Sequence, residues 1–191
     1  MRDVHTLLAR VRGAEPLVQL NEIREEGVVR VIACVATGGQ MVESPFTGEN
    51  GICIRLQCRR RTVPSDEGNE RGSLNLISDE TIGEPFVVAD DGGCAWVVPT
   101  GADLIATMAN VSHHAGVGAK QTALRYLHER RLKVGLFVEQ YVLRPGTRVE
   151  LSGRVALERG EADGYRSVPS PRLAFISDAQ SGAMLRIRVL A

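Results

Sequence analysis

The stretch "MVESPFTGENGICIRLQC", residues 41–58, joins a turn to a strand and decides the fold that the sequence predicts. Pro45 fixes its backbone φ, and Gly48 permits a tight turn. After Gly51, apolar and polar residues alternate with the period of a strand that has one buried face. Ile52, Ile54, Leu56 and Cys58 fall on one face, and Cys53, Arg55, Gln57 and Arg59 fall on the other. The stretch therefore predicts a turn into a core strand, and a site beside that turn stays open as an alternative.

Strand patterns recur along the rest of the chain. The segment "VVRVIACVA" from Val28 is rich in β-branched residues, and "FVVADDGGCAWVVP" predicts a hairpin with its tip at 91–93. The segment "LFVEQYVLRPGTRVELSGRVALE" predicts a strand, a Pro145-Gly146 turn and a second strand in which Gly153 marks a bend or a bulge. With "MLRIRVLA" at the end, the patterns indicate about seven strands.

Helical spacing is confined to short pieces of the sequence. Parts of residues 4–24 show it, with an interruption at Pro16, and residues 119–132 show it again; residues 62–73 form a polar loop. We expect two or three helices, an N-terminal helical segment over 1–27 and one β-rich domain over 28–191. The fold class is α+β and β-rich, built on a small antiparallel barrel or sandwich, with an OB-like barrel as one form.

The composition limits the kind of partner. Lys+Arg and Asp+Glu both number 23 in the 191 residues, so the net charge is zero, unlike that of a typical nucleic-acid binder. No segment approaches the roughly 20 apolar residues of a membrane span, and the first residues lack the apolar core of a secretory signal. We expect a soluble, cytoplasmic protein that binds no nucleic acid.

The cysteines and histidines do not follow the spacing of a metal site. Cys34, Cys53, Cys58 and Cys94 contain no C-x-x-C pair, and His113, His114 and His128 match no motif with a known mechanism. We expect buried, unpaired thiols, no disulfide, no metal and no cofactor.

The candidate acids have structural explanations. Asp90 and Asp91 lie at the predicted hairpin tip, where aspartate serves the turn itself. Glu139 lies in an otherwise apolar run, so it is either exposed on an edge or paired. The basic run 59–61 is partly neutralised by Glu67 and Glu70, and few aromatic residues accompany it to stack bases.

Three blocks in this order resemble the GIDE domain, also called the beside-a-membrane domain. This domain forms the middle region of mitochondrial membrane-anchored E3 ubiquitin ligases and also occurs in bacterial proteins. The residues that carry the resemblance are Ser44, Pro45, Thr47, Gly48, Cys53 and Arg55 in the first block; Asp90, Gly93, Val97, Pro99, Gly101 and Ala102 in the second; and Glu139, Leu143, Gly146, Val149 and Gly153 in the third.

The resemblance implies a recognition domain without chemistry of its own. The related ligases depend on a RING with zinc-binding Cys and His and are flanked by transmembrane helices, and this sequence has neither pattern, so ligase activity does not carry over. Our leading hypothesis is a non-enzymatic GIDE-like module that binds a partner protein, which can itself be membrane-associated, or a small ligand. The alternatives are a hydrolase or transferase that uses Asp90, Asp91, Glu139 and His113, and an OB-like oligonucleotide or oligosaccharide binder.

Overall fold

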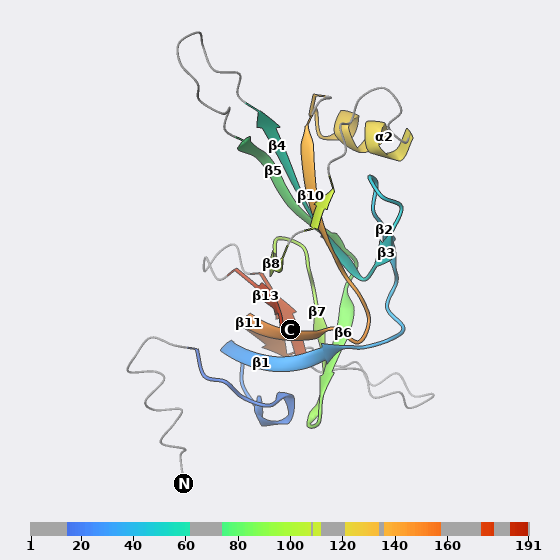
Figure 1. Ribbon diagram of the computed structural model, residues 1–191. Coiled ribbons are helices and arrows are strands. Elements are labelled where there is room, and N and C mark those ends of the chain that lie inside the picture. Colours follow the sequence, from blue (N-terminus) through green and yellow to red (C-terminus); the bar gives the residue numbers. More distant parts are fainter. Residues whose placement is uncertain are drawn as a thin grey trace.

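A barrel and an arm make up the computed structural model, which describes residues 15–61, 74–107, 109–111, 121–133, 136–157, 173–177 and 184–190. Figure 1 shows the barrel with the arm rising from it and helix α2 beside the upper part of the arm. The two parts are interleaved in the chain, because the arm is built from segments that leave the barrel and return to it.

The barrel is closed by five strands. β1 (Gly27–Val35), β6 (Phe86–Asp90), β7 (Gly93–Val97), β12 (Leu173–Ile176) and β11 (Arg148–Leu157) pair in this order, and β11 pairs back to β1. β8 (Asp103–Ile105) and β13 (Arg186–Val189) pair with each other, and β13 also pairs with β11. The pairs β7–β12 and β8–β13 are parallel, so the expectation of a purely antiparallel barrel is wrong.

The barrel core follows from the period of two along its strands. Val31, Ala33 and Val35 of β1 point inward opposite Leu151 and Val149 of β11, and all are buried. Gly153 also faces the core, but the pairing of β1 with β11 runs through it without a register shift. A Cβ at Gly153 would lie 3.0 Å from Leu185 Cδ1, so close packing explains this glycine, and the expected bulge is not found in this pairing.

The arm is a second sheet with a helix on one face. Its strands β5 (Leu74–Gly83), β4 (Cys53–Arg61), β10 (Phe137–Leu143) and β9 (Ala109–Val111) pair in this order, and α2 (Gln121–Glu129) packs against them. The short hairpin of β2 (Val42–Glu43) and β3 (Asn50–Gly51) carries the turn of the opening stretch. Helix and sheet bury a second core of Phe46, Ile54, Leu56, Cys58, Ala123, Tyr126, Leu127, Leu136 and Val138.

Strand β4 of the arm begins beside the barrel core, at Cys53, and continues into the arm. Ile54, Leu56 and Cys58 are fully buried, as the alternation predicts. Cys53 was expected on the less buried face but is also fully buried, because there that face meets the barrel core. Cys53 thus belongs to the barrel core and Cys58 to the arm core, which confirms that the two thiols lie on opposite faces.

The helical content is lower than the sequence predicts. The described residues hold one α-helix, α2, and one 3-10 turn, η1 (Leu20–Glu22), so the expectation of two or three helices is wrong for this part of the chain. Pro16 O accepts from Arg30 N at 2.9 Å, and Val18 N donates to Arg30 O at 2.9 Å, so strand-like pairing uses the backbone that a helix would need. Leu20 and Ile23 keep the helical spacing of three and are buried in the barrel core.

No helix in the described part of the chain is long and apolar enough to cross a membrane.

Candidate functional site

Ser44 organises the turn of the opening stretch. Its N–H donates to Glu49 O at 2.8 Å, and its carbonyl accepts from Gly48 N at 2.9 Å. Its hydroxyl oxygen accepts from the N–H groups of Phe46 and Thr47, each at 3.3 Å. Gly48 adopts φ of 78°, which glycine reaches without steric cost. The motif residues Ser44, Pro45, Thr47 and Gly48 therefore form one closed turn, as predicted.

Gln140 of β10 fixes this turn to the arm. Ser44 Oγ donates to Gln140 Oε1 at 2.6 Å, and Gln140 Nε2 donates to Thr47 Oγ1 at 2.8 Å and to Glu49 Oε2 at 3.2 Å. Ser44 and Gln140 are the buried polar residues of the described chain, with exposed fractions of 0% and 2%. Because buried polar groups are costly when unpaired, this contact fixes the turn in one position.

Helix α2 is held by the same turn. Thr122 Oγ1 donates to Pro45 O at 2.8 Å, and the Phe46 ring meets the Tyr126 ring edge-on at 5.3 Å. The Tyr126 hydroxyl donates to Glu80 Oε2 at 2.8 Å, and Arg130 pairs with the same carboxylate. The Arg130 guanidinium lowers the pKa of Glu80, while burial, followed by the hydrogen bond to Glu80, raises the pKa of Tyr126. The turn therefore ties the helix to the sheet.

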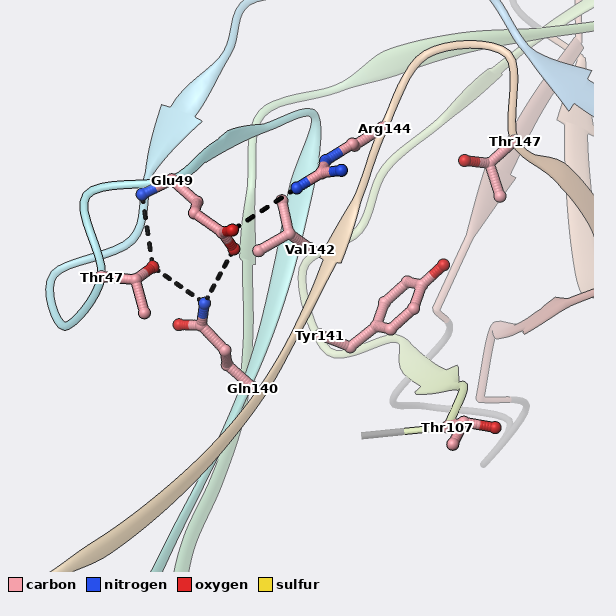
Figure 2. A pocket seen from close by; sticks show the side chains of 8 residues that line it. All are labelled: Thr47, Glu49, Thr107, Gln140, Tyr141, Val142, Arg144 and Thr147. Carbon is pink, nitrogen blue, oxygen red and sulfur yellow. Dashed lines mark hydrogen bonds and ion pairs between the residues drawn. The ribbon is translucent and has the colours of Figure 1, made fainter. Parts of the chain in front are cut away.

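A cleft of about 530 Å³ opens beside the turn, where the arm joins the barrel (Figure 2). Glu49 and Arg144 form an ion pair at its rim, with Oε1 and Nη2 3.5 Å apart and side chains that are 50% and 63% exposed. Tyr141 contributes its ring and hydroxyl, and burial raises the pKa of that hydroxyl. The cleft is lined by Thr47, Glu49, Thr107, Gln140, Tyr141, Val142, Arg144 and Thr147.

The chemistry of this lining is suited to binding. Its single carboxylate, Glu49, already contacts Gln140 and Arg144, and its other polar groups are hydroxyls, an amide and a guanidinium. Paired acids for general acid–base hydrolysis are not found among these lining residues. The cleft can therefore offer hydrogen bonds, one exposed cation and an aromatic surface to a ligand.

Arg55 lines a second cleft, also of about 530 Å³. Arg55 Nη2 lies 2.6 Å from Asp79 Oδ2, and Nη1 lies 2.9 Å from Asp103 Oδ1 and donates to Leu104 O at 2.5 Å. The guanidinium thus connects β4 and β5 of the arm to β8 of the barrel. The Arg55 hydrogen bond lowers the pKa of Asp79.

The second motif block borders this second cleft. Gly101, with φ of 72°, and Ala102 line it, and Ala102 N donates to Pro99 O at 2.9 Å to close the turn before β8. The Pro99 ring also packs beside Gly83, where a Cβ would lie 3.1 Å from Pro99 Cγ. The first two blocks therefore meet where the arm joins the barrel.

The remaining predicted residues have separate structural roles. Asp90 Oδ1 accepts from the N–H groups of Gly92 and Gly93 at 2.7 and 2.8 Å, and Asp90 Oδ2 accepts from Leu20 N at 2.8 Å, so the turn explanation of Asp90 is confirmed. Glu139 is paired, with its Oε2 2.9 Å from Arg59 Nε. Gly146 lies in the turn between β10 and β11.

The candidates for catalysis are not brought together. Asp90 and the exposed Asp91 lie at the tip of the β6–β7 hairpin, while Glu139 lies on β10 of the arm. His113 and His114 are outside the described residues, and His128 is exposed on α2. In the described chain, no group of three His, Cys, Asp or Glu side chains is placed to hold a metal ion.

The cysteines are free thiols, spread over both parts of the structure. Cys53 and Cys58 are buried, as expected, but Cys34 is exposed and Cys94 is half-buried, so the expectation of buried thiols is wrong for these two. Burial raises the pKa of Cys53 to about 12 and that of Cys58 to about 11, so both are protonated at neutral pH. Neither buried thiol is therefore an activated nucleophile.

Sequence reasoning missed Gln140, Glu49, Tyr141 and Arg144. For Gln140 the signal was available, because the alternation of "LFVEQYVL" places it on the same face as Val138 and Val142. The sequence analysis selected the neighbouring charged residue, Glu139, as the candidate. The roles of Glu49, Tyr141 and Arg144 depend on contacts between distant segments and left no local signal.

Comparison of the chain with family models, with curated proteins and with solved structures found no match.

Proposed function

We propose that this chain is a cytoplasmic, non-enzymatic recognition module of the GIDE type that binds a partner protein or a small ligand in the cleft beside the 44–49 turn. The observation that carries the proposal is the buried contact of Ser44 with Gln140, 2.6 Å long, which positions Glu49 at the rim of that cleft. A fixed polar rim around an open concave surface is the usual construction of a binding site.

The GIDE resemblance gains support from where its blocks lie. The turn of the first block and the Pro99–Ala102 turn of the second border the two clefts at the joint, and Arg55 connects both parts. The third block supplies Leu143, whose carbonyl accepts from Ile52 N at 2.8 Å. Residues far apart in the sequence thus gather at the joint.

The test is affinity capture from the native host with a cleft-blocking variant. Thr107 is exposed at the cleft, so Thr107→Trp fills the opening without disturbing a core, and Leu124→Trp on the exposed side of α2 is the matched control. We expect a protein or small molecule that co-purifies with the unmodified chain and with Leu124→Trp, and that is lost with Thr107→Trp. A ligand retained by both variants would place the binding surface elsewhere.

An OB-like oligonucleotide or oligosaccharide binder is the second candidate. In chain order the barrel strands are β1, β6, β7, β11 and β12. Around the barrel the third strand, β7, pairs in parallel with the fifth, β12, and the fourth strand, β11, pairs with the first, β1. OB folds bind ligands on the outer face of their second and third strands, which is a fold-level analogy. Trp96 lies there, since its neighbours Ala95 and Val97 point into the core.

The single tryptophan of the chain makes this candidate easy to test. Stacking of a base or sugar on Trp96 would quench its fluorescence. We expect emission to stay unchanged when mixed-sequence single-stranded oligonucleotides and oligosaccharides are titrated at low salt. Saturable quenching that disappears in Trp96→Leu would favour the OB-like binder over the joint cleft.

A further inference from the structure

Strand β10 is paired unequally on its two edges. On one edge it pairs with β4 along its whole length, from Phe137 to Leu143. On the other edge it pairs with β9 only from Val138 to Gln140. Within the described residues, no strand pairs with the β9-side edge of Tyr141–Leu143. Leu143 O faces β4, where it accepts from Ile52 N at 2.8 Å, and successive residues of a strand direct their main-chain groups to opposite edges, so Val142 presents its N–H and C=O on this open edge.

The cleft runs along this open edge. Gln140, Tyr141 and Val142 all line it, although successive side chains of a strand point to opposite faces. Figure 2 shows Gln140 and Tyr141 leaving β10 on different sides. Because residues from both faces of β10 border the cleft, the cleft lies beside the edge of this strand and not over one of its faces. Thr107 borders the same space, two positions before β9 begins at Ala109.

An extended backbone is the ligand that matches this shape. Main-chain N–H and C=O groups at a strand edge form hydrogen bonds with an added strand, and neighbouring pockets select its alternate side chains. The lining adds the half-buried ring of Tyr141 for an apolar side chain and the Thr107 and Thr147 hydroxyls for polar ones.

Arg144 indicates the charge of that ligand. It follows β10 directly, its side chain is 63% exposed, and its Nη2 lies 3.5 Å from Glu49 Oε1. A half-exposed ion pair of this length contributes little, and a guanidinium has five N–H donors, so Arg144 can still donate to a second carboxylate. An acidic side chain or a free C-terminus beside Arg144 would fix the peptide's direction.

We propose that an extended peptide of a partner protein adds as a strand to β10 at Tyr141–Leu143 and places a carboxylate on Arg144. This proposal rests on the proposed function, because it names the class of ligand that enters the same cleft. It excludes a second copy of this chain as the occupant of the edge.

The test begins with a phage-displayed library of random linear peptides, selected on the full chain and counter-selected on Thr107→Trp. We expect enriched peptides that share an acidic residue or a C-terminal carboxylate at a fixed distance from an apolar residue. The best synthetic peptide should bind Arg144→Gln about tenfold more weakly, as the loss of one charge-assisted hydrogen bond implies. Arg125→Gln, on the exposed side of α2, is the matched control and should bind as the unmodified chain does.

Backbone methylation of that peptide distinguishes strand addition from other binding modes. In a paired strand, the N–H groups of alternate residues point toward the neighbouring strand. N-methylation of alternate residues in one frame should therefore abolish binding, and methylation in the other frame should leave it nearly unchanged. Hydrogen exchange should slow at the amide of Val142, which faces the open edge, when the unmethylated peptide is bound.

Several results would overturn the proposal. A library without binders, a peptide that tolerates methylation in both frames, or protection mapped to the outer barrel face would each exclude strand addition at β10. Concentration-dependent protection of the Val142 amide in the free protein would assign the edge to a second copy. If a host ligand is still lost in Thr107→Trp while the library gives no binder, the cleft remains the binding site and only the peptide is excluded.

Discussion

At the scale of single residues, the contact between Ser44 and Gln140 connects sequence to site. Both side chains are buried, and each satisfies the other at 2.6 Å. Gln140 interrupts an otherwise apolar face with Val138 and Val142, so it weakens the burial that a leucine would give. Its amide instead reaches Thr47 and Glu49 and determines the position of the turn.

This contact predicts the stability of two single variants and their double variant. Ser44→Ala removes the hydroxyl that donates to the buried Gln140 Oε1 and should lower the free energy of unfolding by about 1–3 kcal/mol. Gln140→Leu should cost a similar amount, and the double variant should lose less than the sum, because neither partner is then left unpaired. Urea unfolding measures all three.

Ser78→Ala is the control for these variants. Ser78 lies on β5 and is half-buried, and its substitution should change stability by no more than about 0.5 kcal/mol. Strictly additive losses in the double variant would show that the two side chains do not act as a pair.

At the scale of elements, β4 shows what alternation predicts well. The burial of Ile54, Leu56 and Cys58 follows from the sequence, because alternate side chains of a strand share one face and the opposite face of β4 is polar. The exposed face was incompletely predicted, because Arg55, Gln57 and Arg59 form a network with Asp79 and Glu139 on neighbouring strands. Pairing partners depend on strand order, which no local pattern contains.

The two faces of β4 should respond differently to truncation. Leu56→Ala should cost roughly 2–5 kcal/mol, from lost burial and a cavity in the arm core. Gln57→Ala removes a donor to Asp79 and an acceptor for Arg59, both near solvent, and should cost at most about 1.5 kcal/mol. Urea unfolding measures the loss of stability in each variant. Equal losses would mean that the register of β4 is wrong.

The packing of β11 gives a second prediction at this scale. Gly153→Ala would bring a methyl group within 3.2 Å of Leu185 Cα and 3.0 Å of its Cδ1, so we expect a loss of about 1–3 kcal/mol from overpacking. Gly27→Ala on the neighbouring strand β1 meets nothing within 4 Å and serves as the control. Thermal unfolding compares them, and a Gly153→Ala variant as stable as Gly27→Ala would contradict the packing explanation.

The helices mark the limit of local patterns. The α2 pattern was predicted over 119–132 and the helix spans Gln121–Glu129, because one apolar stripe there meets the sheet. In residues 15–27, the described part of the N-terminal segment, the same spacing produced η1 and no α-helix, because tertiary pairing with Arg30 uses the backbone there. The hairpin at Asp90 was predictable because its turn chemistry is local. The joint clefts were not predictable, because one is assembled from three and the other from four separate segments.

At the scale of the whole molecule, Arg55 connects the arm to the barrel. It contacts Asp79 on β5, Asp103 on β8 and the Leu104 carbonyl, so substituting it removes contacts that hold the arm against the barrel. Arg55 thus has a structural explanation that requires no ligand.

This joint should make stability depend on pH in acid. The Arg55 hydrogen bond lowers the pKa of Asp79 below its usual 3.8 in the folded protein. A lowered carboxyl pKa stabilises the folded state above the unfolded pKa, and that contribution is lost as the pH falls through the folded pKa. The stability difference between the unmodified chain and Asp79→Asn should therefore be constant near neutral pH and shrink below about pH 4. A difference that stays constant down to pH 2 in urea unfolding would contradict this assignment.

The central claim is that ligands enter through the cleft beside the 44–49 turn. Hydrogen exchange of the chain, free and bound to whatever it captures from its host, tests this most directly. We predict slowed exchange at Val142 and Arg144, with the amides around Trp96 on the outer barrel face unchanged. Protection around Trp96 with no change along β10 would contradict the claim.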